Sequence, residues 1–463
     1  MYRQLRLRRM LAACVVLALG LSACGNSGDD DDSADPAPSS DGGSGNEAPA
    51  TDRDEFVSLS GVPGVTDDAI TYSVIATKAN NPLGTCILDC YVDGIEAYFA
   101  YRNDEGGIYG RDLELAEPID DELQQNQARA LEVTSADDTF GNFNATLFAS
   151  GWGDLDSAGI PTYTWGINFA EATGRQHIFP SLAVICSDCT GRAVPFAVQT
   201  VGAHKVASLG YGITENSKIC AQSVADSIDK YSDDVDAEMA YLNDDLDYGL
   251  PSGIGPEVTA MKEAGVDFIS TCLDLNAMKT IAQELDRQGM QDVVLYHPNT
   301  YNQQFVQEAG DLFEGDIVTV QFRPFEADEG DSSGVESINS FREWMEETGS
   351  DPSELAMVGW INADLAFQGL LAAGPEFDRD KVTEATNAMT EYDAGGLINP
   401  INWTTQHEPP TQGDPTHDYA RECSVLLRVE GGEFVPVESA ADPWACWPND
   451  SDEWSEPEAA SFG

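Results

Sequence analysis

The chain has 463 residues, of which 81 are Asp or Glu and only 23 are Lys or Arg, for a formal net charge of −58. Such an excess of carboxylates repels phosphates, which argues against nucleic acid or an anionic membrane surface as a partner. The acidic surface either supports solubility in a salty setting or collects cations. About 400 residues follow the N-terminal segments described next, enough for two lobes with hydrophobic cores.

The N-terminus predicts an exported protein. Four arginines lie among the first nine residues, and the apolar run that follows, 10–21, is too short to span a bilayer comfortably. Leu21-Ser22-Ala23-Cys24-Gly25 resembles a bacterial lipobox, in which a signal peptide (1–23) is removed and Cys24 is lipidated. The alternative is an ordinary secretory signal with a cysteine at its cleavage site. Both interpretations place the protein outside the cytoplasm.

Residues 24–65 predict a disordered acidic tether. Gly, Ser, Pro and Asp dominate this stretch, and it has no apolar periodicity. Such a segment cannot bury enough surface to offset the entropy lost on ordering. The run Asp29–Asp32 fits a solvated spacer better than a metal site, because it lacks a calcium-loop pattern.

The cysteines predict a disulfide framework. Ten are present; Cys14 leaves with the signal and Cys24 is the lipid site, so an even number remains in an exported chain. The CxxC spacing of 186 and 189 also permits redox or zinc chemistry, although no histidine lies beside it. We expect four pairs: Cys86–Cys90, Cys186–Cys189, Cys220–Cys272 and Cys423–Cys446.

The elements of the first half alternate between strand and helix. A β-branched run at 71–77 predicts a buried strand, and the helical spacing of apolar residues predicts a helix over 91–102, ended by Gly106 and Gly107. The remaining elements expected here are strands at 112–115, 130–134, 159–166 and 181–186, and helices at 143–151 and 195–204.

The pattern restarts at residue 205. Strands are expected at 205–209, 237–242, 266–271, 293–296 and 317–322, and helices at 215–231, 256–264, 275–288, 335–348, 361–373 and 381–389. A hairpin is expected over 423–437. Strict alternation implies parallel sheets with helices on both faces, and two such runs imply two lobes.

Recognisable reaction chemistry is missing. The loop 210–215 (GYGITE) begins as a dinucleotide fingerprint would, but Glu215 replaces the third glycine and would repel a pyrophosphate. No nucleophile elbow, zinc motif or phosphate loop occurs, and the five histidines are scattered. We therefore predict a protein that is not an enzyme and that has no metal or cofactor. An extracytoplasmic enzyme using Asp137, Asp138 or Glu215 is the weaker alternative.

Four segments together resemble one family. Gly94–Arg111, which ends in GGIYGR, is similar to the hallmark helix and turn of type I periplasmic solute-binding proteins, in the branched-chain amino-acid-binding group of ABC importers. The segments 256–289, 360–374 and 395–403 resemble further motifs of the same family, in order along the chain.

The resemblance implies an α/β fold of two doubly wound parallel-sheet lobes joined by a three-strand hinge. The expected N-terminal lobe is 66–196 with 322–412, the C-terminal lobe is 197–321 with 413–446, and 447–463 is an acidic tail. It also implies a substrate-binding protein that captures a small organic solute between its lobes, serves an ABC permease and reaches the membrane through Cys24. A sensory lipoprotein built on the same binding module is the alternative.

Ligands of such folds bind beyond the carboxyl ends of the strands, so the strand exits supply the candidate site. Trp165 and Tyr211 would stack on solute or belong to the core; Glu215 and Asp274 would bind an ammonium group or stabilise helices. The expected tyrosine is absent from the exit at 270–273, which leaves amides, urea and aromatic solutes open beside amino acids. The predicted ligand-binding residues are Leu83, Thr139, Phe140, Thr164, Trp165, Gly166, Tyr211, Glu215, Asp274 and Tyr301.

Overall fold

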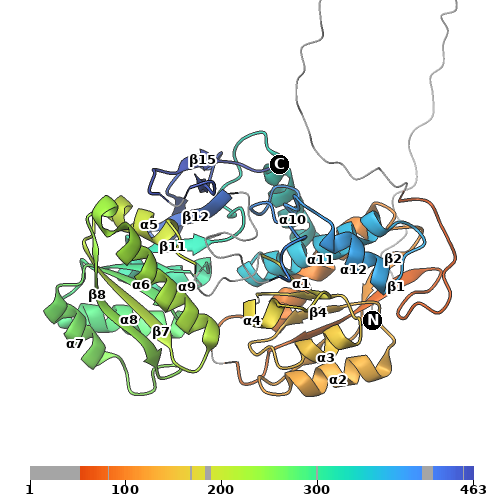
Figure 1. Cartoon of the computed structure of the whole chain (residues 1–463), viewed down its shortest axis with the longest axis horizontal. Helices are drawn as coiled ribbons and strands as arrows, with labels where there is room; N and C mark the ends of the chain where they lie inside the picture. Colours follow the sequence, from red (N-terminus) through yellow and green to blue (C-terminus); the bar gives the residue numbers. More distant parts are fainter. Residues whose placement is uncertain are drawn as a thin grey trace, which may run out of the picture. The chain divides into compact units, whose positions relative to one another are not determined.

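The computed structural model (Figure 1) describes residues 53–81, 83–166, 169–182, 189–298, 301–408, 421–451 and 453–463. The predicted signal peptide, Cys24, most of the tether, Cys186 and most of the strand predicted at 181–186 lie outside these residues. All structural statements below refer to the described part of the chain.

The first sheet is parallel and has six strands, in the order β2-β1-β4-β5-β6, with β3 also paired to β1. Its strands are β1 (Ala69–Ala76), β2 (Asp112–Leu115), β3 (Ile119–Asp120), β4 (Asn142–Ala145), β5 (Thr162–Thr164) and β6 (Ile178–Pro180). The core side chains Tyr72, Phe143 and Tyr163 are fully buried on these strands.

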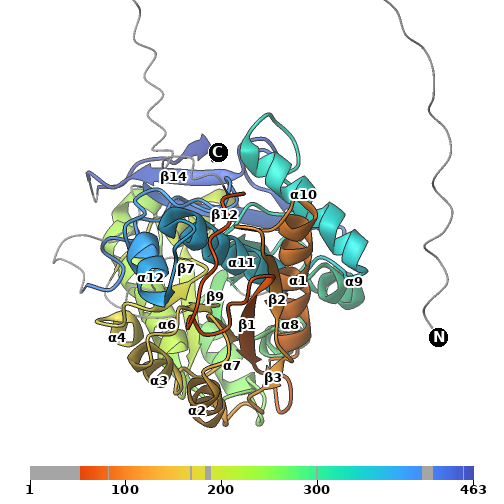
Figure 2. The ribbon, with the colours of Figure 1, turned by 90° about the vertical axis from the view of Figure 1, so that its right-hand side faces the viewer.

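Two groups of helices cover the first sheet (Figure 1). One group packs around α1 and includes segments from far along the chain, as Figure 2 also shows for α1, α10 and α11. The other group, α2 with α3, lies on the opposite face. These helices are α1 (Leu88–Asp104), α2 (Asn126–Ala136), α3 (Trp152–Ser157), α4 (Phe169–Ala172), α10 (Ser333–Thr348), α11 (Glu354–Ala373) and α12 (Arg379–Asn387).

Two glycines allow α1 and α11 to pack backbone to backbone. A Cβ added at Gly94 would lie 1.8 Å from the carbonyl oxygen of Ala356, and one added at Gly359 would lie 2.2 Å from that of Tyr91. Among the described residues, α11 is the one helix long and apolar enough to pass for a membrane span, and 83% of that window is buried inside the protein. A helix that is apolar all round and buried is a core helix.

The second sheet has nine strands, in the order β15-β14-β12-β11-β10-β9-β7-β8, with β13 paired to β12. The part from β7 to β11 is parallel, and the strands from β12 onward are antiparallel. The strands are β7 (Lys205–Tyr211), β8 (Glu238–Leu246), β9 (Phe268–Cys272), β10 (Val294–His297), β11 (Ile317–Val320), β12 (Arg421–Glu430), β13 (Glu433–Pro436), β14 (Trp444–Pro448) and β15 (Glu458–Ala460).

The helices of the second sheet pack in pairs, α5 against α6 and α7 against α8. They are α5 (Ala193–Val201), α6 (Glu215–Val235), α7 (Gly255–Ala264), α8 (Leu275–Gln288), α9 (Gln303–Ala309) and the 3₁₀ turn η1 (Gly310–Phe313). The chain passes between the two sheets three times: after β6, after β11 and before β12. The predicted fold class, two doubly wound lobes with three crossings, is confirmed.

Two elements of the first lobe were predicted wrongly. Residues 130–134 lie within helix α2 rather than in a strand, and the residues predicted as a helix at 143–151 begin with strand β4. Both runs are short and apolar, and periodicity alone does not separate a buried strand from a helix of that length. Pairing of β4 between β1 and β5 decides the outcome.

The predicted acidic tail, 447–463, is part of the fold. It contributes β15, which extends the second sheet by pairing with β14. The buried guanidinium of Arg323, just after β11, donates hydrogen bonds to the Ser461 hydroxyl at 2.8 Å and to the Ala440 carbonyl at 3.2 Å. The C-terminal segment is thereby tied to the second crossing.

Three disulfides occupy predicted positions: Cys86–Cys90, Cys220–Cys272 and Cys423–Cys446. Cys189 is also disulfide-bonded, while Cys186 lies outside the described residues. Cys423–Cys446 joins directly paired residues of β12 and β14. The other two disulfides lie beside the carboxyl ends of strands β1 and β9, at the edges of the sheets where the candidate site is described below.

Candidate functional site

The carboxyl ends of the parallel strands define the candidate site. Neighbouring parallel strands end at the same edge of a sheet, where their loops form the usual ligand position of an open α/β fold. In the first sheet these loops follow β1, β3, β4, β5 and β6, and in the second they follow β7 to β11. The described loops of this kind are 77–81 with 83–87, 121–125, 146–151, 165–166, 181–182 with 189–192, 212–214, 247–254, 273–274, 298 with 301–302, and 321–332.

The loop after β1, described over 77–81 and 83–87, is held in place at several points. The carboxylate of Asp120 accepts hydrogen bonds from the backbone N–H groups of Lys78 and Ala79, each at 3.0 Å. The Asn81 side chain bridges within the loop, donating to the Thr85 carbonyl at 2.7 Å and accepting from the Leu83 N–H at 3.0 Å. The Cys86–Cys90 disulfide then ties the loop to α1. Leu83, one of the predicted residues, is half-buried on this braced loop.

The same loop touches the second lobe. A Cβ added at Gly84 would lie 2.4 Å from the side-chain nitrogen of Asn276, which is in the first turn of α8. Gly84 also has a positive φ of 77°, which glycine adopts without strain. A side chain at position 84 is therefore opposed by the backbone conformation, and it would also require the Asn276 side chain to move.

The exit of β5 combines a buried anchor with open space. Thr164 is fully buried, and its carbonyl accepts hydrogen bonds from the Asn362 amide at 3.0 Å and from the Ser181 N–H at 2.8 Å. Trp165 is half-buried, and a Cβ added at Gly166 would meet nothing within 4 Å. Trp165 and Gly166 thus border open space, whereas the Thr164 side chain belongs to the core.

The second lobe brings together Tyr211, Tyr248 and Asp274 from three strand exits. The Tyr211 hydroxyl donates to the Asp274 carboxylate at 2.5 Å, and the two tyrosine rings meet edge to face at 4.9 Å between centroids. The other Asp274 oxygen caps α8 by accepting from the N–H groups of Asn276 and Ala277. Burial, and after it the Asp274 charge, raises the pKa of Tyr248 to about 12. Burial and the bond to Asp274 raise the pKa of Tyr211 further, so both phenols stay neutral.

A disulfide supports this corner from behind. Cys272 is the last residue of β9 and is bonded to Cys220 of α6. The Ser217 hydroxyl, also on α6, donates to the Cys272 carbonyl at 2.6 Å and accepts from the Tyr211 N–H at 2.7 Å. The exits of β7 and β9 are therefore fixed to the same helix.

Comparison with known proteins identifies the family. The family described as "Periplasmic binding protein" matches residues 87–421, which is more than half of the chain and includes strands of both sheets. The chain belongs to the periplasmic binding protein family. No curated protein sequence matches it.

Solved structures of type I periplasmic binding proteins share the fold. One is a solute-binding protein of an ABC transporter from R. palustris in complex with 4-hydroxybenzoate, with 16% identity, a TM-score of 0.61 and coverage of 83% of this chain and 98% of that one. Another is a branched-chain amino acid ABC transporter protein from Thermus thermophilus with bound valine, with 15% identity, a TM-score of 0.60 and coverage of 80% and 96%. A fatty acid ABC transporter substrate-binding protein from Thermomonospora curvata has 14% identity, a TM-score of 0.56 and coverage of 87% and 98%.

Two of the predicted binding residues lie away from the carboxyl edges. Thr139 and Phe140 precede β4, so they lie at the amino edge of the first sheet, where Phe140 is fully buried against Tyr72 and Phe377. Arg379 of α12 donates to the carbonyls of both residues, at 2.5 and 2.9 Å. Their prediction followed from the wrong strand at 130–134, which moved the expected exit by one element.

The remaining predictions divide between the surface and the core. Glu215 is exposed in the first turn of α6, after the exit of β7. Tyr301 is buried; its hydroxyl donates to Glu326 at 2.6 Å and accepts from the Phe325 N–H at 2.6 Å. In this periplasmic binding protein Tyr301 therefore packs against the segment that follows β11.

Sequence reasoning missed three side chains at the carboxyl edges. Phe148, after β4, is 36% exposed, and Ile213, after β7, is 69% exposed. Tyr248, after β8, is half-buried beside Tyr211. Phe148 was missed because its segment was predicted as a helix. Ile213 lies in the GYGITE loop, whose apolar residue was a usable signal.

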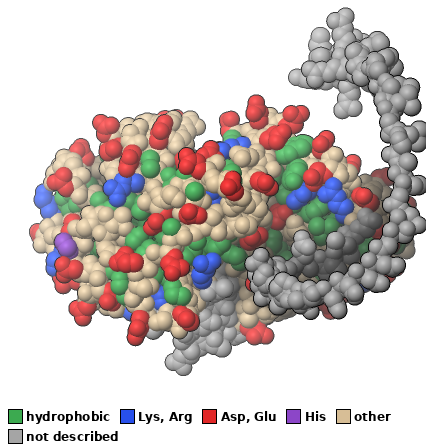
Figure 3. Space-filling model, turned by 90° about the horizontal axis from the view of Figure 1, so that it is seen from above, with side chains coloured by type: hydrophobic (Ala, Val, Ile, Leu, Met, Phe, Trp, Pro, Cys, Tyr) green, Lys and Arg blue, Asp and Glu red, His purple; other side chains and the backbone are tan. Residues whose placement is uncertain are grey.

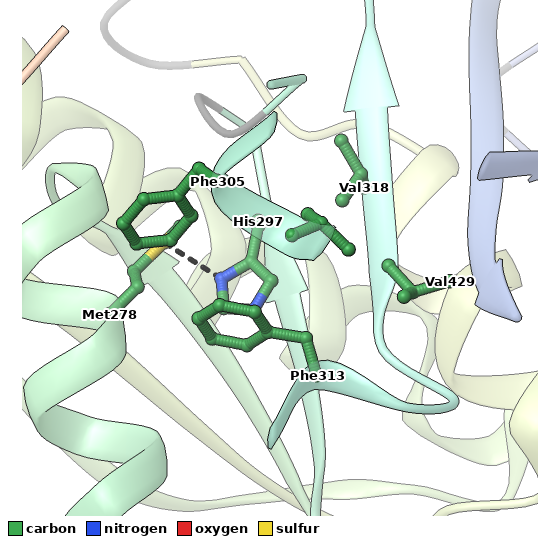
Figure 4. Close-up of a pocket in the computed structure, with 7 residues that line it drawn as sticks. Met278, His297, Phe305, Phe313, Val318 and Val429 are labelled. Carbon is green, nitrogen blue, oxygen red and sulfur yellow. Dashed lines mark hydrogen bonds between the residues drawn. The ribbon is translucent and has the colours of Figure 1, made fainter. Parts of the chain in front are cut away.

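A hydrogen-bonded chain in the second lobe resembles a catalytic triad in its connectivity. Thr271 Oγ1 lies 3.0 Å from His297 Nδ1, and His297 Nε2 lies 3.1 Å from Asp316 Oδ2. All three residues are buried, and the cavity beside them, drawn in Figure 4, has a volume of about 10 Å³. That space barely holds a water molecule, so no substrate reaches the threonine.

Figure 4 also shows that the lining is apolar, with Met278, Phe305 and Phe313 around the imidazole. Burial is the main cause that raises the pKa of Asp316, against the opposing bond from His297. The hydrogen-bonded residues Thr271, His297 and Asp316 are therefore part of the core. Within the described residues, no group of three or more His, Cys, Asp or Glu side chains is arranged to hold a metal ion.

Proposed function

We propose that this periplasmic binding protein is the extracytoplasmic substrate-binding component of an ABC importer, anchored to the membrane through a lipid on Cys24. It would capture a small organic solute between its lobes, 66–196 with 322–412 and 197–321 with 413–446, and deliver it to the permease. The family and the transport functions of its structural neighbours support the transport role. The lipobox supports the anchor.

One observation carries the proposal. The family match spans both sheets, and residues at the carboxyl edges form two preorganised surfaces, one on each lobe. The first consists of the loop 77–81 with 83–87, Trp165 and Gly166. The second centres on the half-buried Tyr248, which packs against the buried Tyr211 beside Asp274. Surfaces held by disulfides and hydrogen bonds before solute arrives lose less entropy when it binds.

The crossings provide the means of closure. Arg192, before α5, is buried and pairs with Glu422 of β12 at 3.4 Å; it also donates to the Pro448 carbonyl at 3.2 Å. Glu422 in turn accepts from the backbone N–H of Ala193. The first and third crossings are thereby tied to each other on the side of the second lobe. We expect the lobes to close about these segments by a hinge motion and to meet where Gly84 contacts Asn276.

Native mass spectrometry tests the proposal directly. The protein, purified from its own membrane in detergent, is expected to carry a small organic molecule that is lost on denaturation. A library of solutes is then screened by thermal unfolding, since a ligand at 100 times its Kd adds about 2.7 kcal/mol to the free energy of unfolding.

Variants at the site supply the controls. Trp165→Ala should weaken the binding of the identified solute, whereas Trp454→Ala, in the C-terminal segment, should not. Cys24→Ala should move the protein from the membrane fraction to the soluble fraction. A protein without co-purifying solute that also shows no thermal shift across the library would contradict the binding role.

A further inference from the structure

The electrostatics of the carboxyl edges restrict the class of solute. We propose that the solute of this site is an apolar organic amine that carries no carboxylate. This inference rests on the proposed function, because it names the solute class of the same site.

The helix N-termini at these edges are already occupied by negative charge. An uncapped N-terminus is the ready anion site of an α/β fold, because its free N–H groups and its dipole attract negative charge. Here α1, α6 and α7 carry Asp89, Glu215 and Glu257 in their first turns, and α8 is capped by Asp274. A carboxylate on the solute would be repelled at each of these four positions.

Three more helices of eight or more residues follow a parallel strand, and they have the same character. Helix α10 carries Glu336 in its first turn, and at the start of α5 the Glu422 carboxylate accepts from the N–H groups of Arg192 and Ala193. The first turn of the third, α2, carries no acid, but Asp121 and Glu122 lie in the loop that leads into it. The Leu123 N–H donates to the Asp121 carboxylate at 2.9 Å. No described helix of this length on these edges therefore offers a solute anion an N-terminus free of nearby carboxylates.

Basic side chains are scarce in the same loops. In the described residues that connect the parallel strands to their helices, the basic side chains are Lys78, Arg192 and Arg323. Lys78 pairs with Asp89 at 2.8 Å, and the buried Arg192 pairs with Glu422 at 3.4 Å. The buried Arg323 donates to the Ala327 carbonyl and to the Ser461 hydroxyl. The same loops contain the carboxylates of Asp121, Glu122, Asp247 and Asp274. Among the charged side chains on the face of the protein shown in Figure 3, acidic ones also predominate. A field of this sign concentrates cations near the edges and repels anions.

Exposed apolar side chains at the carboxyl edges favour a solute with an apolar body. Six large apolar side chains are exposed among the described residues, and two of them, Phe148 and Ile213, lie at carboxyl edges, one on each lobe. The half-buried Trp165 and Tyr248 lie at the same edges. Aromatic faces attract organic cations as well as apolar groups. An amine on a hydrocarbon or aromatic body matches both the charge and the apolar surface.

Two matched probe series test the inference, each with a constant carbon skeleton and a changing head group. One series is benzylamine, benzyl alcohol and benzoate; the other is isoamylamine, isoamyl alcohol and isovalerate. Binding is measured by thermal shift and calorimetry at one ionic strength, with methylamine as the control for non-specific cation binding. In at least one series we expect the amine to bind about tenfold or more tightly than the alcohol, and the carboxylate not to bind.

Substitutions locate the binding. Phe148→Ala and Ile213→Ala should each weaken the binding of the amine about fivefold or more. The controls Leu131→Ala and Leu242→Ala should leave its affinity unchanged, because these exposed side chains, at 47% and 46%, lie away from the carboxyl edges. Glu215→Lys should weaken the binding of the amine. The control Glu263→Lys, at an exposed position near the C-terminal end of α7, should leave the affinity for the amine unchanged.

The inference is overturned if a carboxylate binds as tightly as its amine, if the alcohol equals the amine, if methylamine reproduces the effect or if no probe binds. It is also overturned if the four apolar substitutions behave alike. None of these results removes the proposed function. A co-purifying anionic solute would refute the proposal that the solute is an amine and would support the transport role. A protein that binds no solute at all would refute both the amine proposal and the proposed function.

Discussion

The close contact between helices α1 and α11 offers the sharpest test of the packing that supports the site. Gly94 and Gly359 lie inside these helices, and neither has a positive φ, so the backbone itself would tolerate alanine. Alanine would even improve helix propensity by about 1 kcal/mol. The obstacle is the neighbouring backbone, since a Cβ at position 94 would lie 1.8 Å from a carbonyl oxygen of α11.

The magnitude follows from the size of this overlap. An ordinary contact needs more than 3 Å, and a backbone carbonyl cannot rotate away as a flexible side chain can. The helices must therefore separate, at an overpacking cost of 1–3 kcal/mol or somewhat more. We expect Gly94→Ala to lower the free energy of unfolding by about 2 kcal/mol, because the upper end of this cost exceeds the gain of about 1 kcal/mol in helix propensity.

The contact between α1 and α11 also positions the carboxyl end of strand β5 at the candidate site. Asn362 of α11 donates to the Tyr91 hydroxyl of α1 at 2.7 Å and to the Thr164 carbonyl at 3.0 Å. Tyr91 donates to the Tyr163 carbonyl at 3.1 Å. Separation of the helices should move the end of β5, and with it Trp165, so solute binding should weaken together with stability.

Urea unfolding at constant salt measures the effect, and Gly153→Ala is the matched control. Gly153 is also a helical glycine, but the nearest atom to an added Cβ is the tip of Arg175 at 3.7 Å. This control should be neutral or gain up to about 1 kcal/mol. A Gly94→Ala protein as stable as the wild type would show that α1 and α11 are not in backbone contact and would refute the reasoning.

Three further predictions concern the conditions under which the fold survives. Removing Cys220–Cys272 with serines should lower the free energy of unfolding by about 4 kcal/mol, because the bond closes a loop with a sequence separation of 52. The same change at Cys86–Cys90, with a separation of 4, should cost less; equal losses in urea unfolding would contradict the loop-entropy account. Burial lowers the pKa of His407 from 6.5 to about 4, so the unfolded chain binds a proton between these pH values that the folded chain does not. Stability should therefore fall by about 3 kcal/mol as the pH drops from 6.5 to 4, and His407→Phe should show a smaller fall in parallel titrations; identical pH profiles would refute this. Finally, the net charge of −58 should make stability rise steeply as NaCl is raised from about 0.1 M to about 1 M, which shortens the Debye length from about 10 Å to about 3 Å. A urea midpoint that does not depend on salt would show that surface repulsion is unimportant.

The errors of sequence reasoning share one cause. Residues 130–134 and 143–151 are short runs in which apolar residues fit either period, and only their neighbours in the sheet decide between strand and helix. Strand β4 forms because it lies between β1 and β5, whose residues are distant in sequence. The strand that was meant to place Thr139 and Phe140 at a carboxyl edge is part of helix α2, so these two residues lie at the amino edge instead.

Other features were readable because their cause is local. The helix over 275–288 was predicted with its bounds as observed, since Asp274 caps its start and Gly289, with a φ of 72°, ends it. The alternation of strand and helix in the second lobe also followed from periodicity, because helices α6 and α8, with 21 and 14 residues, are long enough to show their period. The parallel sheets and the two lobes follow from that alternation.

The tertiary structure alone decided which of these elements act together. Tyr211 and Asp274 are 63 residues apart, and neither strand exit indicates by itself that the phenol meets the carboxylate at 2.5 Å. The contact of Gly84 with Asn276 and the exposure of Phe148 and Ile213 likewise depend on where distant loops end. Sequence determines composition, charge and local periodicity, whereas a site at the edge of a parallel sheet is assembled from loops that only the completed sheet brings together.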